Sequence, residues 1–271
     1  GRYRIVWDRS APRVINVPGN VRIVGESQHS TVLKFEPNEY DFGVSGIDAI
    51  RVPWPYHLSI EQLTLQGPDA NTQAIGAFPA VAHRYNTVVE LSSVTLEHVT
   101  LRSWSHGLRV SSAATSVRMV DCDVQTWNQG YFHADDGLGT RGGTMRVENC
   151  RFEVRAIPAA LPSSGEHGIY ATPGLVCVIQ GNHFVACDFQ AVQIYSGGSS
   201  IEPGGVVIRD CTFENDCASG IVVRHDAKPF APMISNCTFR TRNIPLQVCN
   251  GGALIDGCHF APYGVTAWGQ P

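Results

Sequence analysis

The chain has 271 residues, a formal net charge of −4 and 43% hydrophobic residues, with 27 glycines and 16 prolines. No stretch approaches the roughly 18 consecutive apolar residues of a membrane-spanning helix, and a slightly acidic chain is a poor ligand for nucleic acid. We therefore expect neither a membrane nor a nucleic acid as a partner. The glycine and proline content is typical of turn-rich β architectures.

A phrase of eight residues recurs along most of the chain and closes each time on an apolar residue. Its copies are 58–65, 94–101, 117–124, 145–152, 177–184, 206–213, 232–239 and 253–260. Successive closing residues are 21 to 36 positions apart. A repeat of this length with β-type alternation predicts a stacked solenoid, because one such unit cannot bury its apolar face alone.

A second strand follows each phrase. Glycine opens it in the copies at 107–110, 130–133, 168–171, 220–223 and 264–267, while 191–194 and 245–248 fill the same slot without glycine. Two or three short strands per repeat, with no helical period, predict an all-β parallel β-helix of roughly 8–11 coils. We expect residues 1–271 to form a single domain. The chain opens on a strand-like segment without an initiator Met, a signal peptide or a capping helix, which indicates a piece cut from a longer protein.

Five of the nine cysteines occupy one position of the repeat. They are Cys122, Cys150, Cys211, Cys237 and Cys258, and each follows Asp, Asn or Gly, as a tight turn with positive φ favours. We expect an inward stack of free thiols. The alternative is a disulfide framework. Neighbouring coils are about 4.8 Å apart, farther than the Cβ separation of about 3.8 Å that a disulfide prefers. The sequence contains no Cys-x-x-Cys pair, the spacing that would indicate a metal site.

The opening segments 3–7, 14–26 and 31–35 and the phrases of the type Val-x-Ile-x-Asn-Cys-x-Phe resemble the right-handed parallel β-helix, pectate-lyase-like superfamily. This superfamily contains polysaccharide lyases, polygalacturonase-type hydrolases, alginate epimerases and phage tailspikes. The resemblance covers essentially the whole chain and is specific for the fold. It implies a polysaccharide ligand in a groove along the stacked strands, and a location outside the cell or on a virion surface.

The outward position of the second strand gives the substrate-binding candidates. These are Arg109, Phe132, Tyr170 and Gln193, with Tyr195 two residues further along its strand. Phe132, Tyr170 and Gln193 are expected on successive coils about 4.8 Å apart. Sugar rings can pack their apolar faces on aromatic faces and donate hydrogen bonds to the amide. The alternative is an ordinary surface ladder that only stabilises the sheet.

Charged residues next to these strands give the catalytic candidates. They are Asp135, Asp136, Glu166, His167, Arg224, His225 and Asp226. Glycoside hydrolysis needs a carboxylic acid and a carboxylate, and adjacent Asp135 and Asp136 would raise one carboxyl pKa by mutual repulsion. The alternative is a solvated Asp-Asp-Gly turn.

The resemblance adds a comparison with polygalacturonases, whose Asp-Asp and Gly-His-Gly motifs are partly matched by Asp135-Asp136 and by Glu166-His167-Gly168. One aspartate would be the acid or base and His167 a helper. Three features differ: the Asn-x-Asp motif expected near Ser111-Ser112 is missing, Glu166 replaces a glycine, and the Arg-x-Lys motif has no counterpart.

A lyase is the other possibility, with Arg224 or His225 as base or clamp. No cofactor is expected otherwise, but in a lyase Asp135, Asp136 and Asp226 could hold Ca²⁺. The 130 and 220 copies are three coils apart, about 14 Å, so the two clusters form one catalytic centre only if a loop folds back and could instead be two subsites of one groove. The chain is predicted to bind and cleave a polysaccharide. The alternative is a non-catalytic tailspike or fibre segment, and the assembly is a monomer or a homotrimer.

Overall fold

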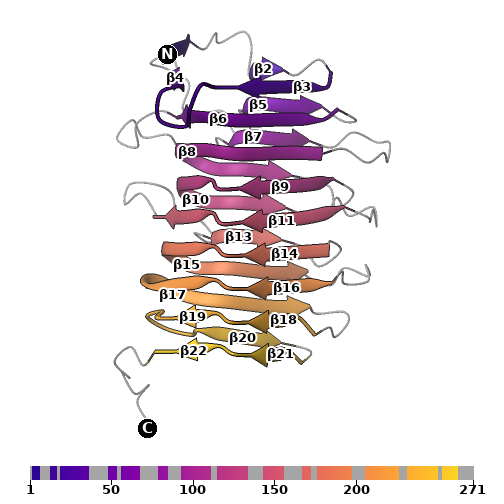
Figure 1. The fold of residues 1–271 in the computed structure, drawn as a ribbon, viewed down its shortest axis with the longest axis vertical. Helices are drawn as coiled ribbons and strands as arrows, with labels where there is room; N and C mark the ends of the chain where they lie inside the picture. The colour runs from indigo at the N-terminus through magenta and orange to yellow at the C-terminus, as the bar shows by residue number, and fades with distance from the viewer. Residues whose placement is uncertain are drawn as a thin grey trace.

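The structure is a computed structural model. It describes residues 2–6, 13–16, 19–36, 48–53, 56–67, 79–84, 93–110, 115–133, 143–155, 167–171, 176–196, 205–225, 231–249 and 252–261. All regular structure in these ranges is β-strand. The strands stack along one axis from the N-terminal to the C-terminal end (Figure 1). The predicted parallel β-helix is confirmed.

Three columns of parallel strands form the sides of the solenoid. The first column runs through β3 (Val21–Val24), the start of β6 (Leu58–Gln66), the start of β8 (Ser93–Val110), β9 (Ser116–Val120), β11 (Thr144–Glu148), β14 (Val176–Gln180), β16 (Val206–Arg209), β18 (Met233–Ser235) and β21 (Leu254–Asp256). These nine stacked strands in the described residues fit the predicted number of coils.

The second column stacks the strands that close each phrase. It contains β1 (Arg2–Val6), β4 (Val32–Glu36), the end of β6, the middle of β8, the start of β10 (Asp123–His133), β12 (Arg151–Val154), the start of β15 (His183–Ser196), the start of β17 (Thr212–His225), β19 (Thr238–Phe239) and β22 (His259–Phe260).

The third column contains the glycine-led strands. It runs through β2 (Arg13–Asn16), β5 (Asp48–Pro53), β7 (Pro79–Arg84), the ends of β8 and β10, β13 (His167–Ala171), the ends of β15 and β17, and β20 (Leu246–Cys249). The sequence predicted short separate strands, but β8 passes through all three columns without interruption. Register shifts in the pairing of β8 with β10 turn the corner instead of a loop.

From β6 onward, a tight turn joins the first and second columns on each described coil. One residue of each turn has a φ between 51° and 65°, and these residues are Gln62, His98, Asp121, Asn149, Gly181, Asp210, Asn236 and Gly257. Asp, Asn and Gly tolerate this left-handed backbone best. The predicted positive-φ turn before the cysteines is therefore confirmed.

The cysteine stack is also confirmed, and an asparagine interrupts it on one coil. The nine cysteines are free thiols, and the Sγ of Cys211 lies 3.7 Å from the carbonyl of Ile179 on the preceding coil. On the coil between Cys150 and Cys211, buried Asn182 takes the position. Its Oδ1 accepts from the Cys150 amide at 2.8 Å and its Nδ2 donates to the Val147 carbonyl at 2.8 Å, so its polar atoms are satisfied.

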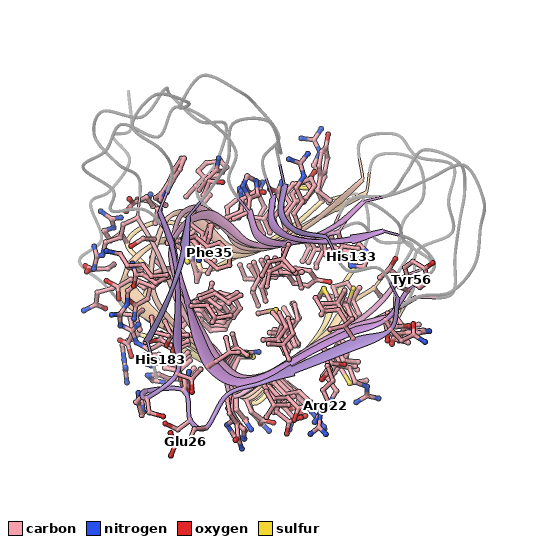
Figure 2. The ribbon with its side chains drawn as sticks, turned by 90° about the horizontal axis from the view of Figure 1, so that it is seen from above. Arg22, Glu26, Phe35, Tyr56, His133 and His183 are labelled. Atoms are coloured by element: carbon pink, nitrogen blue, oxygen red, sulfur yellow. The ribbon has the colours of Figure 1, made fainter. Side chains whose placement is uncertain are left out.

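The closing residues of the phrases form the core beneath the second column. Phe152, Phe184, Phe213, Phe239 and Phe260 stack with ring centroids 4.8 to 5.1 Å apart. The first four are at most 1% exposed, while Phe260 in the last described coil is 44% exposed. Inward side chains fill the space that the three columns enclose (Figure 2).

The glycine that opens the third-column strand lies where successive coils approach most closely. A Cβ on Gly130 would lie 2.5 Å from the Gly168 carbonyl oxygen and 2.7 Å from the Phe152 ring, and a Cβ on Gly168 would lie 2.5 Å from the Ala191 oxygen. At Gly130 and Gly168 it is therefore the lack of space, and not a positive φ, that favours glycine, whereas Ala191 takes the equivalent position on its own coil. The corner brings the next residues of each strand into register on the outside of the solenoid.

Candidate functional site

Two sets of side chains run side by side along the third column. The aromatic strip consists of Arg109, Phe132, Tyr170, Gln193, Tyr195 and Arg224. The corner column consists of His106, Gln129, His167 and Gln190, each just before the glycine position of its strand. Parallel pairing repeats each position from coil to coil, so residues far apart in sequence become neighbours.

The predicted order of the strip is confirmed by the register. Arg109 pairs with Phe132, Phe132 with Tyr170, and Tyr170 with Gln193. The rings of Phe132 and Tyr170 are stacked, with centroids 5.2 Å apart and planes inclined by 20°. The Arg109 guanidinium lies 5.5 Å from the Phe132 centroid. These half-buried side chains form one continuous row across four coils.

This stacking changes how the strip can contact a sugar. Arg109 comes from the coil before Phe132 and Tyr170 from the coil after it, and both contact the Phe132 ring. A sugar face on Phe132 would share the ring with these two neighbours, and this packing stays a prediction. The strip also places polar groups on neighbouring coils, namely the Arg109 guanidinium, the Tyr170 hydroxyl and the Gln193 amide.

The strip continues toward the C-terminal end through Tyr195 and Arg224. These two residues pair between β15 and β17, and the Arg224 guanidinium lies 5.4 Å from the Tyr195 ring centroid. Tyr195 meets Tyr170 edge-on at 6.4 Å. Burial and the neighbouring Tyr195 raise the pKa of Tyr170, so its hydroxyl keeps its proton at neutral pH and can donate a hydrogen bond.

His167 supports the strip from the corner column. It is 3% exposed, and its ring packs edge-on against Tyr170 at 5.4 Å and against Phe189 at 5.3 Å. Its Nε2 lies 3.2 Å from the Gln190 side-chain oxygen. A carbonyl oxygen only accepts hydrogen bonds, so with this assignment of the Gln190 amide Nε2 carries a proton. The buried ring is placed to fix the orientation of Tyr170.

His106 occupies the equivalent position two coils earlier. Its ring meets Phe132 edge-on at 6.2 Å, and its Nδ1 lies 2.9 Å from the Ser105 hydroxyl. Burial, followed by the positive charge of Arg109, lowers the pKa of His106 from 6.5 to about 3. The ring is therefore neutral at neutral pH and places no second positive charge beside Arg109.

On β10, the face opposite Phe132 carries a buried polar pair. Tyr131 and His133 are 0% exposed, as the predicted alternation requires, and the Tyr131 hydroxyl lies 2.6 Å from Nδ1 of His133. Figure 2 places His133 inside the outline of the solenoid. Burial raises the pKa of Tyr131. His133 thus belongs to the core and not to the charged residues that follow the strand.

The structure describes only part of the predicted catalytic set. Asp135, Asp136, Glu166, Asp226 and the side chain of His225 lie outside the described residues. His167 and Arg224 are described, and both contact the aromatic strip. The strands of Gly130 and Gly220 are separated by three pairing steps, from β10 through β13 and β15 to β17, as predicted.

Sequence reasoning missed the rest of the corner column and Phe189. His106, Gln129 and Gln190 were not selected, although each directly precedes the glycine slot, as His167 does. That shared position was the available signal. Of the tryptophans, Trp104 is buried in the core with its Nε1 donating to the Leu65 carbonyl at 2.9 Å, while Trp127 is half-buried.

No cluster of three or more potential metal ligands occurs within the described ranges. The Ca²⁺ site proposed for Asp135, Asp136 and Asp226 falls on residues outside those ranges and stays a prediction. No helix in the described part of the chain is long and apolar enough to span a membrane.

Comparisons with known proteins agree with the architecture. A family model described as "Right handed beta helix region" matches residues 85–260. Among solved structures, the A-module of the mannuronan C-5 epimerase AlgE6 from Azotobacter vinelandii has a TM-score of 0.49 and 13% identity, covering 97% of this chain and 90% of the epimerase chain. ORF18 of Geobacillus virus E2 has a TM-score of 0.51 and 12% identity, covering 97% of this chain and 53% of the viral one.

These structural likenesses concern the fold alone, and the chain spans about half the length of the viral protein. A search of curated proteins found no match.

Proposed function

The chain belongs to the right-handed β-helix family, and from this premise we propose that it binds a polysaccharide along the aromatic strip and cleaves it. The observation that carries the proposal is a row of hydrogen-bond donors on four of five successive coils, namely Arg109, the Tyr170 hydroxyl, Gln193 and Arg224. Phe132 stacks on Tyr170, Tyr195 meets Tyr170 edge-on, and the two guanidinium groups lie against Phe132 and Tyr195.

A linear polymer suits such a row. The hydroxyl and ring oxygens of a sugar chain recur at regular intervals, and donors on a rigid solenoid recur once per coil, about 4.8 Å apart. The two arginines can bind carboxylates of an acidic polymer bidentately. The net charge of −4 means that the rest of the chain would on balance repel a strongly acidic polymer. The strip therefore favours either a neutral or a moderately acidic polysaccharide.

Cleavage is assigned to the carboxylates next to the strip in sequence. Asp135 and Asp136 follow β10 by two and three residues, and Glu166 directly precedes β13. In a hydrolase one carboxyl would protonate the leaving oxygen while another activates water. In a lyase Arg224 or His225 would neutralise or deprotonate a uronate, and Asp135 and Asp136 would hold Ca²⁺, with Asp226 as a further ligand only if a loop folds back across the three coils. His167 acts as a positioning residue for Tyr170 in either case.

The alternative is a non-catalytic glycan-binding segment of a tailspike or fibre, as a monomer or a homotrimer on a virion or cell surface. One observation favours it: within the described residues, the strip supplies hydrogen-bond donors and no carboxylate. The two functions share the same binding surface. They differ in whether the segments around Asp135 and Glu166 perform chemistry.

A polysaccharide panel tests both functions. Binding is measured by affinity electrophoresis, and cleavage by reducing ends for hydrolysis and by ultraviolet absorbance of unsaturated uronates for elimination. Arg109→Gln is expected to weaken binding at least fivefold. Arg118→Gln, which removes an exposed arginine paired with Glu97 at 3.0 Å on the first column, should change nothing.

Asp135→Asn and Asp136→Asn are expected to abolish cleavage and to leave binding intact. Full activity in both variants would exclude these carboxylates from the reaction. Binding without any product from the wild type would establish the non-catalytic alternative. If Arg109→Gln and Arg118→Gln bind equally, the strip is not the ligand surface.

A further inference from the structure

A pocket of about 300 Å³ opens on the second column, on the far side of the corner from the aromatic strip. It shares no residue with the strip. Its walls come from β8, β10, β12 and the residue that follows β12, and they include Arg102, Ser103, Gln125, Trp127, Glu153 and Arg155. The volume lies at the low end of ligand sites, about 300–1,000 Å³, so it suits one sugar ring and not a chain.

Irregular backbone builds this pocket. Ser103 has a φ of 60°, and the pairing of β8 with β10 shifts register on both sides of Thr126. Bulges of this kind re-aim side chains and are frequent beside functional sites. Here they accompany the half-buried position of Trp127, whose ring also packs against the core. An indole at a pocket wall offers an apolar surface to the C–H face of a pyranose.

Arg102 supplies a positive charge that no described carboxylate neutralises. Its Nε donates to the Gln125 oxygen at 3.1 Å, and Gln125 in turn donates to Asp123 at 2.7 Å. Gln125 is neutral, so the Arg102 guanidinium keeps its charge at the pocket edge. Other described arginines nearby differ: Arg151 forms ion pairs with Asp123 at 3.0 Å and with Glu153 at 2.7 Å.

Glu153 supplies a fixed acceptor on another wall. Its carboxylate accepts from Arg151 at 2.7 Å and from Arg155 at 3.1 Å, and the hydrogen bond from Arg151 lowers its pKa. Arg155 is also tied to Asp216 at 2.9 Å. Glu153 is therefore ionised and oriented, and its remaining lone pairs can accept hydrogen bonds from sugar hydroxyls.

We propose that this pocket is a second ligand site, which binds a single carboxylated pyranose such as a glucuronate residue. Trp127 packs on the C–H face, Arg102 binds the carboxylate and Glu153 accepts from the hydroxyls. The site is independent of cleavage and of the aromatic strip. It would give the solenoid a separate binding site for an acidic side branch or a terminal acidic sugar.

Methyl β-D-glucuronide and methyl β-D-glucoside are the probes, with binding followed by saturation-transfer NMR and titration. The wild type is expected to bind the glucuronide at least fivefold more tightly than the glucoside. Arg102→Gln should remove this preference and leave glucoside binding within twofold. Trp127→Ala should weaken both sugars at least tenfold, while Trp127→Phe should stay within threefold of the wild type.

Arg118→Gln is the control and should bind the glucuronide as the wild type does. Equal binding of the two sugars by the wild type, or an unchanged preference in Arg102→Gln, would overturn the proposal. So would a loss of the preference in Arg109→Gln that Arg102→Gln does not show, because it would place the sugar on the strip. Arg102 is exposed, so its variant decides the matter even if Trp127→Ala fails to fold.

Discussion

Tyr170 is the residue on which the contacts of the aromatic strip converge. Its ring stacks on Phe132 and receives the edges of His167 and Tyr195. These neighbours come from β10, β13 and β15, so one side chain connects three successive coils. The stacking fixes the ring, and the hydroxyl remains as the group that a ligand can use.

Tyr170→Phe separates these two roles. The stack keeps its shape, while one donor to the polysaccharide is lost, at a cost of roughly 0.5–1.5 kcal/mol. Binding should weaken about two- to tenfold, with the urea midpoint of unfolding unchanged. Tyr56→Phe, on a half-buried tyrosine four coils away, is the matched control. Equal affinities in the two variants would show that the Tyr170 hydroxyl does not touch the ligand.

His106 makes a pH-dependent contribution to stability. The folded state lowers its pKa from 6.5 to about 3, so between these values the unfolded chain binds a proton that the folded chain does not. Stability from this group is fully present above pH 6.5 and falls as the pH drops toward 3, by up to about 1.4 kcal/mol per pH unit.

His106→Gln should remove the contribution of His106 to the pH dependence of stability, while the contribution of the carboxylates stays as before. The unfolding free energy, measured in urea at pH 7, 6, 5 and 4, should fall less steeply for the variant than for the wild type. Parallel curves for the two proteins would mean that His106 is charged or accessible in the folded state.

The corner glycines decide how closely neighbouring coils can approach. Gly168→Ala would place a Cβ 2.5 Å from the Ala191 oxygen and 2.9 Å from the Phe184 ring. Because these are core and backbone atoms, the coils must move, and we expect a loss of roughly 1–3 kcal/mol. Gly205→Ala, with nothing within 4 Å of the added Cβ, should change the unfolding free energy by less than about 0.5 kcal/mol. A similar effect of both substitutions would contradict the steric origin of the motif.

Local repeats were enough to predict the columns, the tight turns and the cysteine stack. Asp121 and Asn149 adopt the expected positive φ, because this turn depends mainly on the residue itself and the cysteine that follows it. The uninterrupted path of β8 was missed, since a bulge at Ser103 depends on contacts with the neighbouring coils. The Trp127 pocket was missed for the same reason, because its residues look unrelated until the register aligns them. The corner column was missed although its residues share the position before the glycine slot. The predicted carboxylates lie outside the described residues.

In the described residues, strand pairing joins each coil only to the coils directly before and after it, and a few long side chains reach one coil further, as Arg155 does to Asp216 at 2.9 Å. The phenylalanine ladder makes this visible, because Phe213 lies between two rings at 4.9 and 4.8 Å, whereas Phe260 has a described ring neighbour only in Phe239, at 5.0 Å. Phe213 is 0% exposed and Phe260 is 44% exposed. In such a solenoid, stability is close to a sum of coil and interface terms.

Removing a ring should therefore cost more in the middle of the ladder than in its last described coil. Phe213→Ala removes a ring that stacks on two neighbours and leaves a cavity, at a cost of about 3–5 kcal/mol. Phe260→Ala removes a ring with one described stacking neighbour that is only about half buried, so we expect roughly 1–2 kcal/mol. Urea unfolding followed by circular dichroism measures both, and the middle variant should also broaden the transition as the two halves uncouple. Equal costs with equally sharp transitions would mean that the coils unfold as one indivisible unit.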